Sequence, residues 1–149
     1  MITSIKGGVT AAKGFSASGV HCGIRKNRTK RDIALIFSET RAAAAAVYTT
    51  NLVKGAPLTV TKNHIADGYA QAVICNSGNA NTCNANGIEI AEAMSDLCAK
   101  ELNILAEDVI VASTGVIASP CPSTPSPKVC PVWLRDCLWR AARLLLKAS

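Results

Sequence analysis

One amphipathic helix between two short apolar runs is the feature that most restricts how this chain can fold. Residues 87–102 carry apolar side chains at the i, i+4, i+7 and i+8 spacing of one helical face, at Ile90, Met94, Leu97 and Cys98. Asn86 stands where a helix start is expected, and Lys100 falls in the last turn. The flanking runs, Gln71–Cys75 and Val109–Ala112, are typical of buried strands. The sequence therefore predicts an α/β fold.

Three further segments contribute expected elements. Asp32–Ser38 and Leu58–Thr61 are predicted as strands. Residues 42–50 are ambiguous, because five consecutive alanines favour a helix while the segment Val47–Thr50 favours a strand.

Composition limits the size and class of the protein. The 149 residues suffice for one ordinary domain, and a hydrophobic content of 49% with only 4% aromatics predicts an aliphatic core. No apolar run reaches the ~18 residues of a membrane span, and residues 1–8 lack a signal-peptide core. The seven cysteines form no CxxC pair and no metal-like spacing with His21 or His64. We therefore expect thiols, no metal site and a cytoplasmic location.

The positive charge is concentrated at the C-terminal end. The net charge is +6, yet residues 1–118 carry eleven basic and nine acidic side chains, and residues 119–149 carry five and one. The basic run Arg25–Arg31 could touch phosphates, but it lacks interleaved aromatics and a recognisable nucleic-acid module. A solvated loop between strands is the expected structure, with no nucleic-acid or membrane partner.

Two polar segments, Asn76–Asn81 and Ser113–Ile117, each follow a predicted strand. A strand that runs into small hydroxyl, amide and glycine residues predicts a loop with free backbone N–H groups, which can hold a developing negative charge. The residues Ser-Thr-Gly alone are more typical of an ordinary turn, and neither segment supplies a nucleophile.

The composition changes abruptly near Ala118. Five of the six prolines, both tryptophans and three of the seven cysteines lie after it. Residues 119–127 cannot hold a helix or a central strand, whereas residues 132–147 could form a basic helix. We expect a partial domain over residues 1–118 and a proline-rich, basic tail over residues 119–149 that does not pack against it.

Motifs spread along the first 117 residues resemble those of a known family. They are Gly8–Phe15, Asp32–Ile36, Ala45–Asn51 with Val53–Lys54 and Ala56–Pro57, Asn76–Asn81 and Ser113–Ile117. In this order, and with the helix between the last two, they resemble the N-terminal part of the ornithine acetyltransferase family, also called bifunctional glutamate N-acetyltransferase, of arginine biosynthesis.

The resemblance implies a layered α/β sandwich with sheets between helix layers, in which the segment near Val47 is a strand. It also implies an enzyme that cleaves itself before an internal threonine, giving an α/β heteromer. That threonine then moves an acetyl group from N-acetylornithine to glutamate. No cofactor is needed, although some members also use acetyl-CoA.

The resemblance also assigns site residues. Thr114 and Gly115 match the family's oxyanion-hole pair, a threonine hydroxyl and a glycine N–H that stabilise the tetrahedral intermediate. The segment Asn76–Asn81 matches a family signature without a chemical step. We expect its amides to bond loop backbone, and a structural or a substrate-facing role stays open.

The resemblance stops after Ile117, and nothing here matches the self-cleavage segment with its nucleophilic threonine. Thr124, the only threonine after Thr114, lies in the proline-rich stretch and is a poor nucleophile. Loss of one nucleotide at position 118 would explain the tail, because the original frame can then encode a family-like sequence. Tryptophan has only one codon, so the bases at Trp133 are known and limit which amino acids the original frame can encode there. A frameshift is favoured over a genuine divergent tail.

Three functions remain open. The first is a fragment of an N-acyltransferase, inactive alone because it lacks the nucleophile. The second is a non-catalytic module that uses the same half-fold to bind an amino-acid-like ligand or a partner. The third is a nucleic-acid or membrane-surface protein acting through residues 25–31 and the tail, which is disfavoured because most of the charge lies in that tail.

Overall fold

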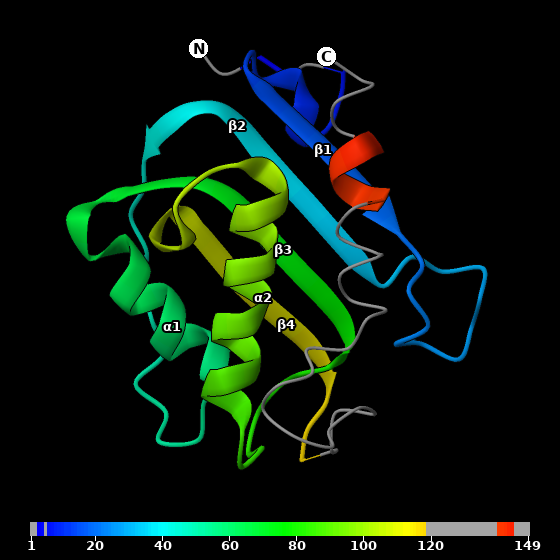
Figure 1. Ribbon diagram of the computed structural model, residues 1–149, viewed down its shortest axis with the longest axis vertical. Coiled ribbons are helices and arrows are strands. Elements are labelled where there is room, and N and C mark those ends of the chain that lie inside the picture. Colours follow the sequence, from blue (N-terminus) through cyan, green and yellow to red (C-terminus); the bar gives the residue numbers. More distant parts are fainter. Residues whose placement is uncertain (1–2, 5, 119–139, 145–149) are drawn as a thin grey trace.

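The computed structural model describes residues 3–4, 6–118 and 140–144, and these form one mixed sheet with helices against it (Figure 1). Short 3₁₀ turns at Val9–Ala11, Ile65–Asp67 and Ala106–Asp108 connect the larger elements. Those larger elements are, in chain order, β1 (Phe15–Val20), β2 (Ile33–Ala43), α1 (Ala56–His64), β3 (Tyr69–Asn79), α2 (Gly87–Leu102) and β4 (Val109–Val116).

The four strands lie in the order β1-β2-β3-β4. β1, β2 and β3 pair antiparallel, whereas β3 and β4 run parallel and are joined through α2. A parallel pair needs such a crossover connection, which explains why the helix stands between the two apolar runs. The α/β class predicted from the sequence is confirmed.

Both helices lie on one face of the sheet (Figure 1). Strand residues of this face alternate with residues of the other face, so Leu35, Ile74 and Val111 are buried under the helices. Ala91, Met94 and Cys98 of α2 fill the space above them, and α1 adds Val60. The opposite face carries half-buried or exposed small apolar side chains, at Ala34, Ile36, Val73, Cys75, Ile110 and Ala112.

The predicted helix and three of the four predicted strands are confirmed. α2 begins at Gly87 and ends at Leu102, with Asn86 at the N-cap and Lys100 in the last turn. Gln71–Cys75 lies within β3, and Val109–Ala112 within β4. Asp32–Ser38 corresponds to β2, which begins one residue later and continues to Ala43. β1 had no counterpart among the expected elements.

The predicted strand at Leu58–Thr61 is wrong, because this segment forms α1. Valine and threonine favour strands, but Val60 and Thr61 are buried as part of a helix that packs against β4 and the core. Pro57, in the first turn of α1, has a fixed φ that suits a helix start. Tertiary burial therefore outweighed local propensity here.

The strand implied near Val47 is also wrong. β2 ends at Ala43 after a register shift between Phe37 and Ala42, and residues 44–50 are irregular. The side chain of Val47 is fully exposed, so burial contributes nothing that could hold this segment in a sheet. The basic run Arg25–Arg31 lies in the exposed connection between β1 and β2, as expected.

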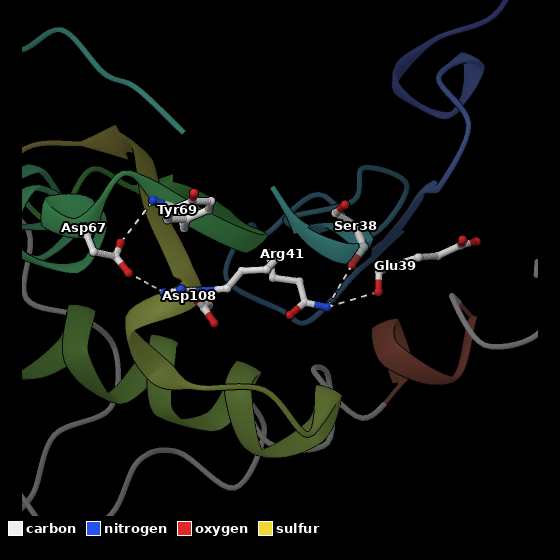
Figure 2. A network of polar contacts seen from close by, with 7 residues as sticks. Ser38, Glu39, Arg41, Asp67, Tyr69 and Asp108 are labelled. Atoms are coloured by element: carbon white, nitrogen blue, oxygen red, sulfur yellow. Dashed lines mark hydrogen bonds and ion pairs between the residues drawn. The ribbon is translucent and has the colours of Figure 1, made fainter. Parts of the chain in front are cut away.

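At the end of the sheet where β3 and β4 begin, the side chain of Arg41 joins neighbouring strands (Figure 2). Arg41, next to the register shift of β2, pairs with Asp67 and, through Nε at 2.6 Å, with Asp108. Its guanidinium also lies 5.1 Å from the ring centroid of Tyr69. Because Tyr69 begins β3 and Asp108 directly precedes β4, these contacts join the starts of both strands to β2.

Residues 140–144 are the part of the tail that the structure describes. They are helical, Ala141 is fully buried and belongs to the core cluster, and Ser18 Oγ of β1 donates to the Ala141 carbonyl at 2.9 Å. The expectation that the tail does not pack is therefore wrong at Ala141 and Ala142, which are both buried. The predicted proline-rich stretch 119–127, Thr124 and most of the predicted helix 132–147 lie outside the described residues.

Among the described residues, Cys75, Cys83 and Cys98 are free thiols, as expected. Cys22 is disulfide-bonded, so the expectation of a thiol is wrong there. Within the same part of the chain, no helix has the length and apolar character that crossing a membrane requires.

Candidate functional site

Thr114 and Gly115 lie in the carboxyl half of β4, beside the carboxyl end of β3. Thr114 is in register with Ser77, and Gly115 with Gly78. The expected loops are therefore wrong, because both polar segments continue their strands, β3 to Asn79 and β4 to Val116. Parallel strands bring their carboxyl ends to one edge, where ligand sites of α/β sheets usually lie.

The backbone N–H of Gly115 points away from β3. Val116 accepts a hydrogen bond from Ala80 N–H at 2.9 Å and thus faces β3. Val111 bonds the side chain of Thr61 on α1 instead, with its N–H (3.1 Å) and its carbonyl (3.0 Å), and thus faces outward. Because the N–H groups of a parallel strand alternate in direction, Gly115 shares the outward direction of Val111. β4 is an edge strand, so this N–H is directed away from the sheet.

The side chain of Thr114 lies on the face of the sheet without helices. Val109 and Val111 are buried under the helices, so the even-numbered residues of β4, Ile110, Ala112 and Thr114, face the other way. Thr114 and Gly115 are both exposed. A hydroxyl and the next N–H are therefore both accessible at one corner of the sheet, and such a pair can donate to a single oxyanion.

Only glycine fits at position 115. Its φ is +136°, and a Cβ there would lie 2.3 Å from the carbonyl carbon of Gly78 and 2.6 Å from the nitrogen of Asn79. Both neighbours are backbone atoms of β3 and cannot yield without moving the strand. The glycine therefore serves the fold as well as leaving its N–H accessible.

The asparagines of the segment Asn76–Asn81 bond backbone, as expected. Asn76 Nδ2 donates to the Asn79 carbonyl at 3.0 Å, and Asn79 Oδ1 accepts from Asn81 N–H at 2.7 Å. Asn81 Nδ2 donates to the carbonyl of Gly87, the first residue of α2, at 2.8 Å. These three asparagines are buried. The amides thus fasten the end of β3 to the start of α2.

Two buried polar atoms beside the site lack a partner in the described part of the chain: Asn76 Oδ1 and Ser113 Oγ. They belong to register partners on β3 and β4 and lie on the helix-covered face. Unpaired buried polar groups cost ~1–3 kcal/mol each, so a small polar group such as a water molecule would be stabilised there.

The described residues offer no general base next to Thr114. His21 Nδ1 bonds the Lys30 carbonyl at 2.9 Å, and His64 Nδ1 bonds the carbonyl of Val109, the first residue of β4. Burial raises the pKa of the Cys75 thiol, which disfavours the nucleophilic thiolate. Within the same residues, no group of three or more His, Cys, Asp or Glu side chains could hold a metal ion.

A shallow cavity of about 330 Å³ lies on the helix-free face, one strand away from Thr114. Its lining includes Ala34, Cys75, Ser77 and Arg31. Sequence reasoning did not find this cavity, because β1, β2 and β3 build it from residues far apart in the chain. It also missed Thr61, whose hydroxyl covers the edge of β4 just before the site.

The chain matches the model of the ArgJ family over residues 16–142. This match extends beyond Ile117, the last residue of the motifs described above. Several proteins that are named arginine biosynthesis bifunctional protein ArgJ are similar to this chain in sequence. That of Caldanaerobacter subterraneus is 49% identical over 119 residues, and that of Gloeobacter violaceus 49% over 120. In both cases the match covers 79% of this chain and 29% of the relative, so the chain spans less than a third of these curated relatives.

Two crystal structures are similar in fold. The arginine biosynthesis bifunctional protein argJ of Bacillus halodurans superposes with a TM-score of 0.78 and 38% identity. Ornithine acetyltransferase of Mycobacterium tuberculosis, solved in complex with ornithine, superposes with a TM-score of 0.81 and 35% identity. Each alignment covers 91% of this chain and 69% of the solved chain.

Proposed function

Because the chain belongs to the ArgJ family of arginine biosynthesis, we propose that it is the N-terminal part of a glutamate N-acetyltransferase. In this proposal Thr114 and Gly115 form the oxyanion hole for acetyl transfer from N-acetylornithine to glutamate, with acetyl-CoA as a further donor. The enzyme acts in the cytoplasm and needs no bound cofactor. The 149-residue chain is inactive alone.

The outward N–H of Gly115 beside the exposed Thr114 is the observation that carries the proposal. When a nucleophilic hydroxyl attacks the acetyl carbonyl, the oxygen becomes an anion that needs donors within 2.7–3.1 Å. The Thr114 hydroxyl and the Gly115 N–H supply two. Collapse of the intermediate expels the ornithine amine, which takes up the proton that the attacking hydroxyl lost, and leaves an acetyl ester on the nucleophile. The amine of glutamate then attacks this ester, which forms N-acetylglutamate and returns a proton to the freed hydroxyl.

The nucleophile comes from outside this chain. We propose that it is the threonine freed by self-cleavage in longer family members, which join two fragments as a heteromer. One finding supports cleavage: the chain covers 69% of each solved chain but only 29% of the curated relatives. A solved chain is therefore much shorter than a complete relative. The division at residue 118 and the frameshifted origin of the tail belong to the same proposal, and the nucleotide sequence downstream of codon 118 tests them.

A chimera tests the activity. Residues 1–117 are joined to the part of the Caldanaerobacter subterraneus relative that follows its matched segment, and acetyl transfer from N-acetylornithine to glutamate is measured. We expect self-cleavage and turnover by the chimera, and none by the 149-residue chain. Thr114→Ala should lower kcat by ~10²-fold or more, whereas Thr59→Ala, an exposed threonine of α1, should not. Turnover by the 149-residue chain, or a chimera indifferent to Thr114→Ala, would refute the proposal.

The cavity beside Arg31 favours a second candidate, a non-catalytic module that binds an amino-acid-like ligand or a partner. No ion pair or hydrogen bond to another described residue occupies the Arg31 guanidinium, which could hold a carboxylate. Under this alternative the 149-residue chain binds ornithine in calorimetry, Arg31→Ala abolishes the binding, and the chimera has no transferase activity. Ornithine binding that survives Arg31→Ala would exclude this site.

A further inference from the structure

Gly115 rests directly on the backbone of β3. A Cβ at position 115 would lie 2.3 Å from the carbonyl carbon of Gly78 and 2.6 Å from its oxygen. No side chain intervenes between the two strands here, so any displacement of the Gly78–Asn79 peptide displaces Gly115. The direction of the Gly115 N–H therefore depends on where β3 places this one peptide.

The space beside Gly78 is limited by Ile24. Its φ is +129°, and a Cβ at this position would lie 2.7 Å from Cγ2 of Ile24 and 3.4 Å from the Ile24 carbonyl oxygen. The Ile24 side chain packs against the hydrophobic core and is attached close to its own backbone, so it cannot move aside freely. Gly78 thus lies between Ile24 and Gly115, with no room for a side chain.

Asp32 fixes the loop that carries Ile24. Its buried carboxylate accepts hydrogen bonds from the N–H groups of Cys22 (2.6 Å) and Arg25 (3.0 Å), on either side of Ile24. The Asp32 carbonyl accepts a bond from Ser77 N–H at 2.8 Å, directly before Gly78. One buried residue therefore holds both the loop and the strand at the point where they meet.

We propose that Gly78 is a positioning residue for the oxyanion hole, because it lets the loop around Ile24 set the position of the Gly115 N–H. The inference rests on the proposed function for its catalytic consequence. It also gives the segment Asn76–Asn81 a role in the chemistry, acting through Gly115 rather than on the substrate. A side chain at position 78 must move β3 or Ile24 by roughly 1 Å, and a misplacement of that size can cost ~10²-fold in rate.

The first measurement uses the 149-residue chain and needs no activity. Gly78→Ala should shift the ¹H–¹⁵N resonance of Gly115 and change its amide exchange rate. Gly68→Ala is the matched control, because Gly68 also has a positive φ (+81°), but a Cβ there would meet no other atom within 4 Å. It should leave the Gly115 resonance unchanged. An unperturbed Gly115 in folded Gly78→Ala would overturn the proposal.

The second measurement uses the chimera. Gly78→Ala should lower kcat by about 10–100-fold while KM changes less than about threefold, as expected for a misplaced transition-state donor. The double variant Gly78→Ala/Ile24→Ala should recover part of this loss, because it removes Cγ2 of Ile24, the atom 2.7 Å from the alanine methyl, and leaves neighbours no closer than 3.4 Å among those nearest to it. A kcat per folded molecule within about twofold of the parent, or no recovery in the double variant, would contradict the role.

Two outcomes distinguish a failure of the positioning role from a failure of the proposed function. If Gly78→Ala does not fold, Ile24→Ala decides, because removing the support behind Gly78 should perturb the Gly115 amide and lower kcat, and no effect on either overturns the inference. If the parent chimera is inactive, the proposed function fails, while the Gly115 amide still tests the positioning role in the 149-residue chain.

Discussion

Thr61→Val should destabilise the chain far more than its small change in shape suggests. The Thr61 hydroxyl donates to the Val111 carbonyl at 3.0 Å and accepts from the Val111 N–H at 3.1 Å, and both residues are buried. Valine has nearly the same volume but leaves these two backbone groups unpaired. Each unsatisfied buried group costs ~1–3 kcal/mol, so the free energy of unfolding should fall by about 2–5 kcal/mol.

Urea denaturation of the 149-residue chain, followed by circular dichroism, measures this loss. Thr59→Val is the matched control, because Thr59 is exposed on the same helix and the same substitution there removes no buried hydrogen bond. Thr61→Ser keeps the hydroxyl and removes one methyl group, so it should cost about 1 kcal/mol. Equal destabilisation by Thr61→Val and Thr59→Val would show that the edge of β4 does not depend on this hydroxyl.

Three further predictions concern glycine packing, pH and thiol reactivity. Gly115→Ala should destabilise the fold by several kcal/mol in the same assay, because its Cβ would overlap backbone atoms of β3; a shift below about 1 kcal/mol would contradict this contact. A backbone N–H and a guanidinium donate to Asp67 and lower its pKa below the ordinary 3.8. Its contribution is therefore present above about pH 4 and is lost as the pH falls through the folded pKa, so Asp67→Asn should be slightly less stable than the parent at pH 7, and this difference should shrink as the pH falls below 4. Burial raises the pKa of Cys98 to about 12, so iodoacetamide at pH 8 should label the exposed Cys83 first, and equal labelling rates in peptide mapping would argue against the buried position.

The sequence alone determined those elements in which the spacing of apolar residues matches the side chains that the fold buries. The bounds of α2 followed from its apolar spacing, because this helix presents one face to the core. The apolar runs within β3 and β4 were recognisable because short, continuous apolar segments are typical of buried strands. Thr114 and Gly115 were identified through family motifs, since a hydroxyl and a glycine after a strand are by themselves more typical of a turn.

Only the tertiary structure decided the elements whose local propensity conflicts with their surroundings. Leu58–Thr61 became part of α1 because a helix brings Thr61 to the unpaired edge of Val111, a partner fifty residues away. The segment around Val47 was left outside the sheet because no neighbouring strand pairs with it in the described chain. The contact between Gly78 and Gly115 likewise depends on the parallel register of β3 and β4. Sequence patterns record which side chains are apolar, but distances between distant backbones exist only once the strands are paired.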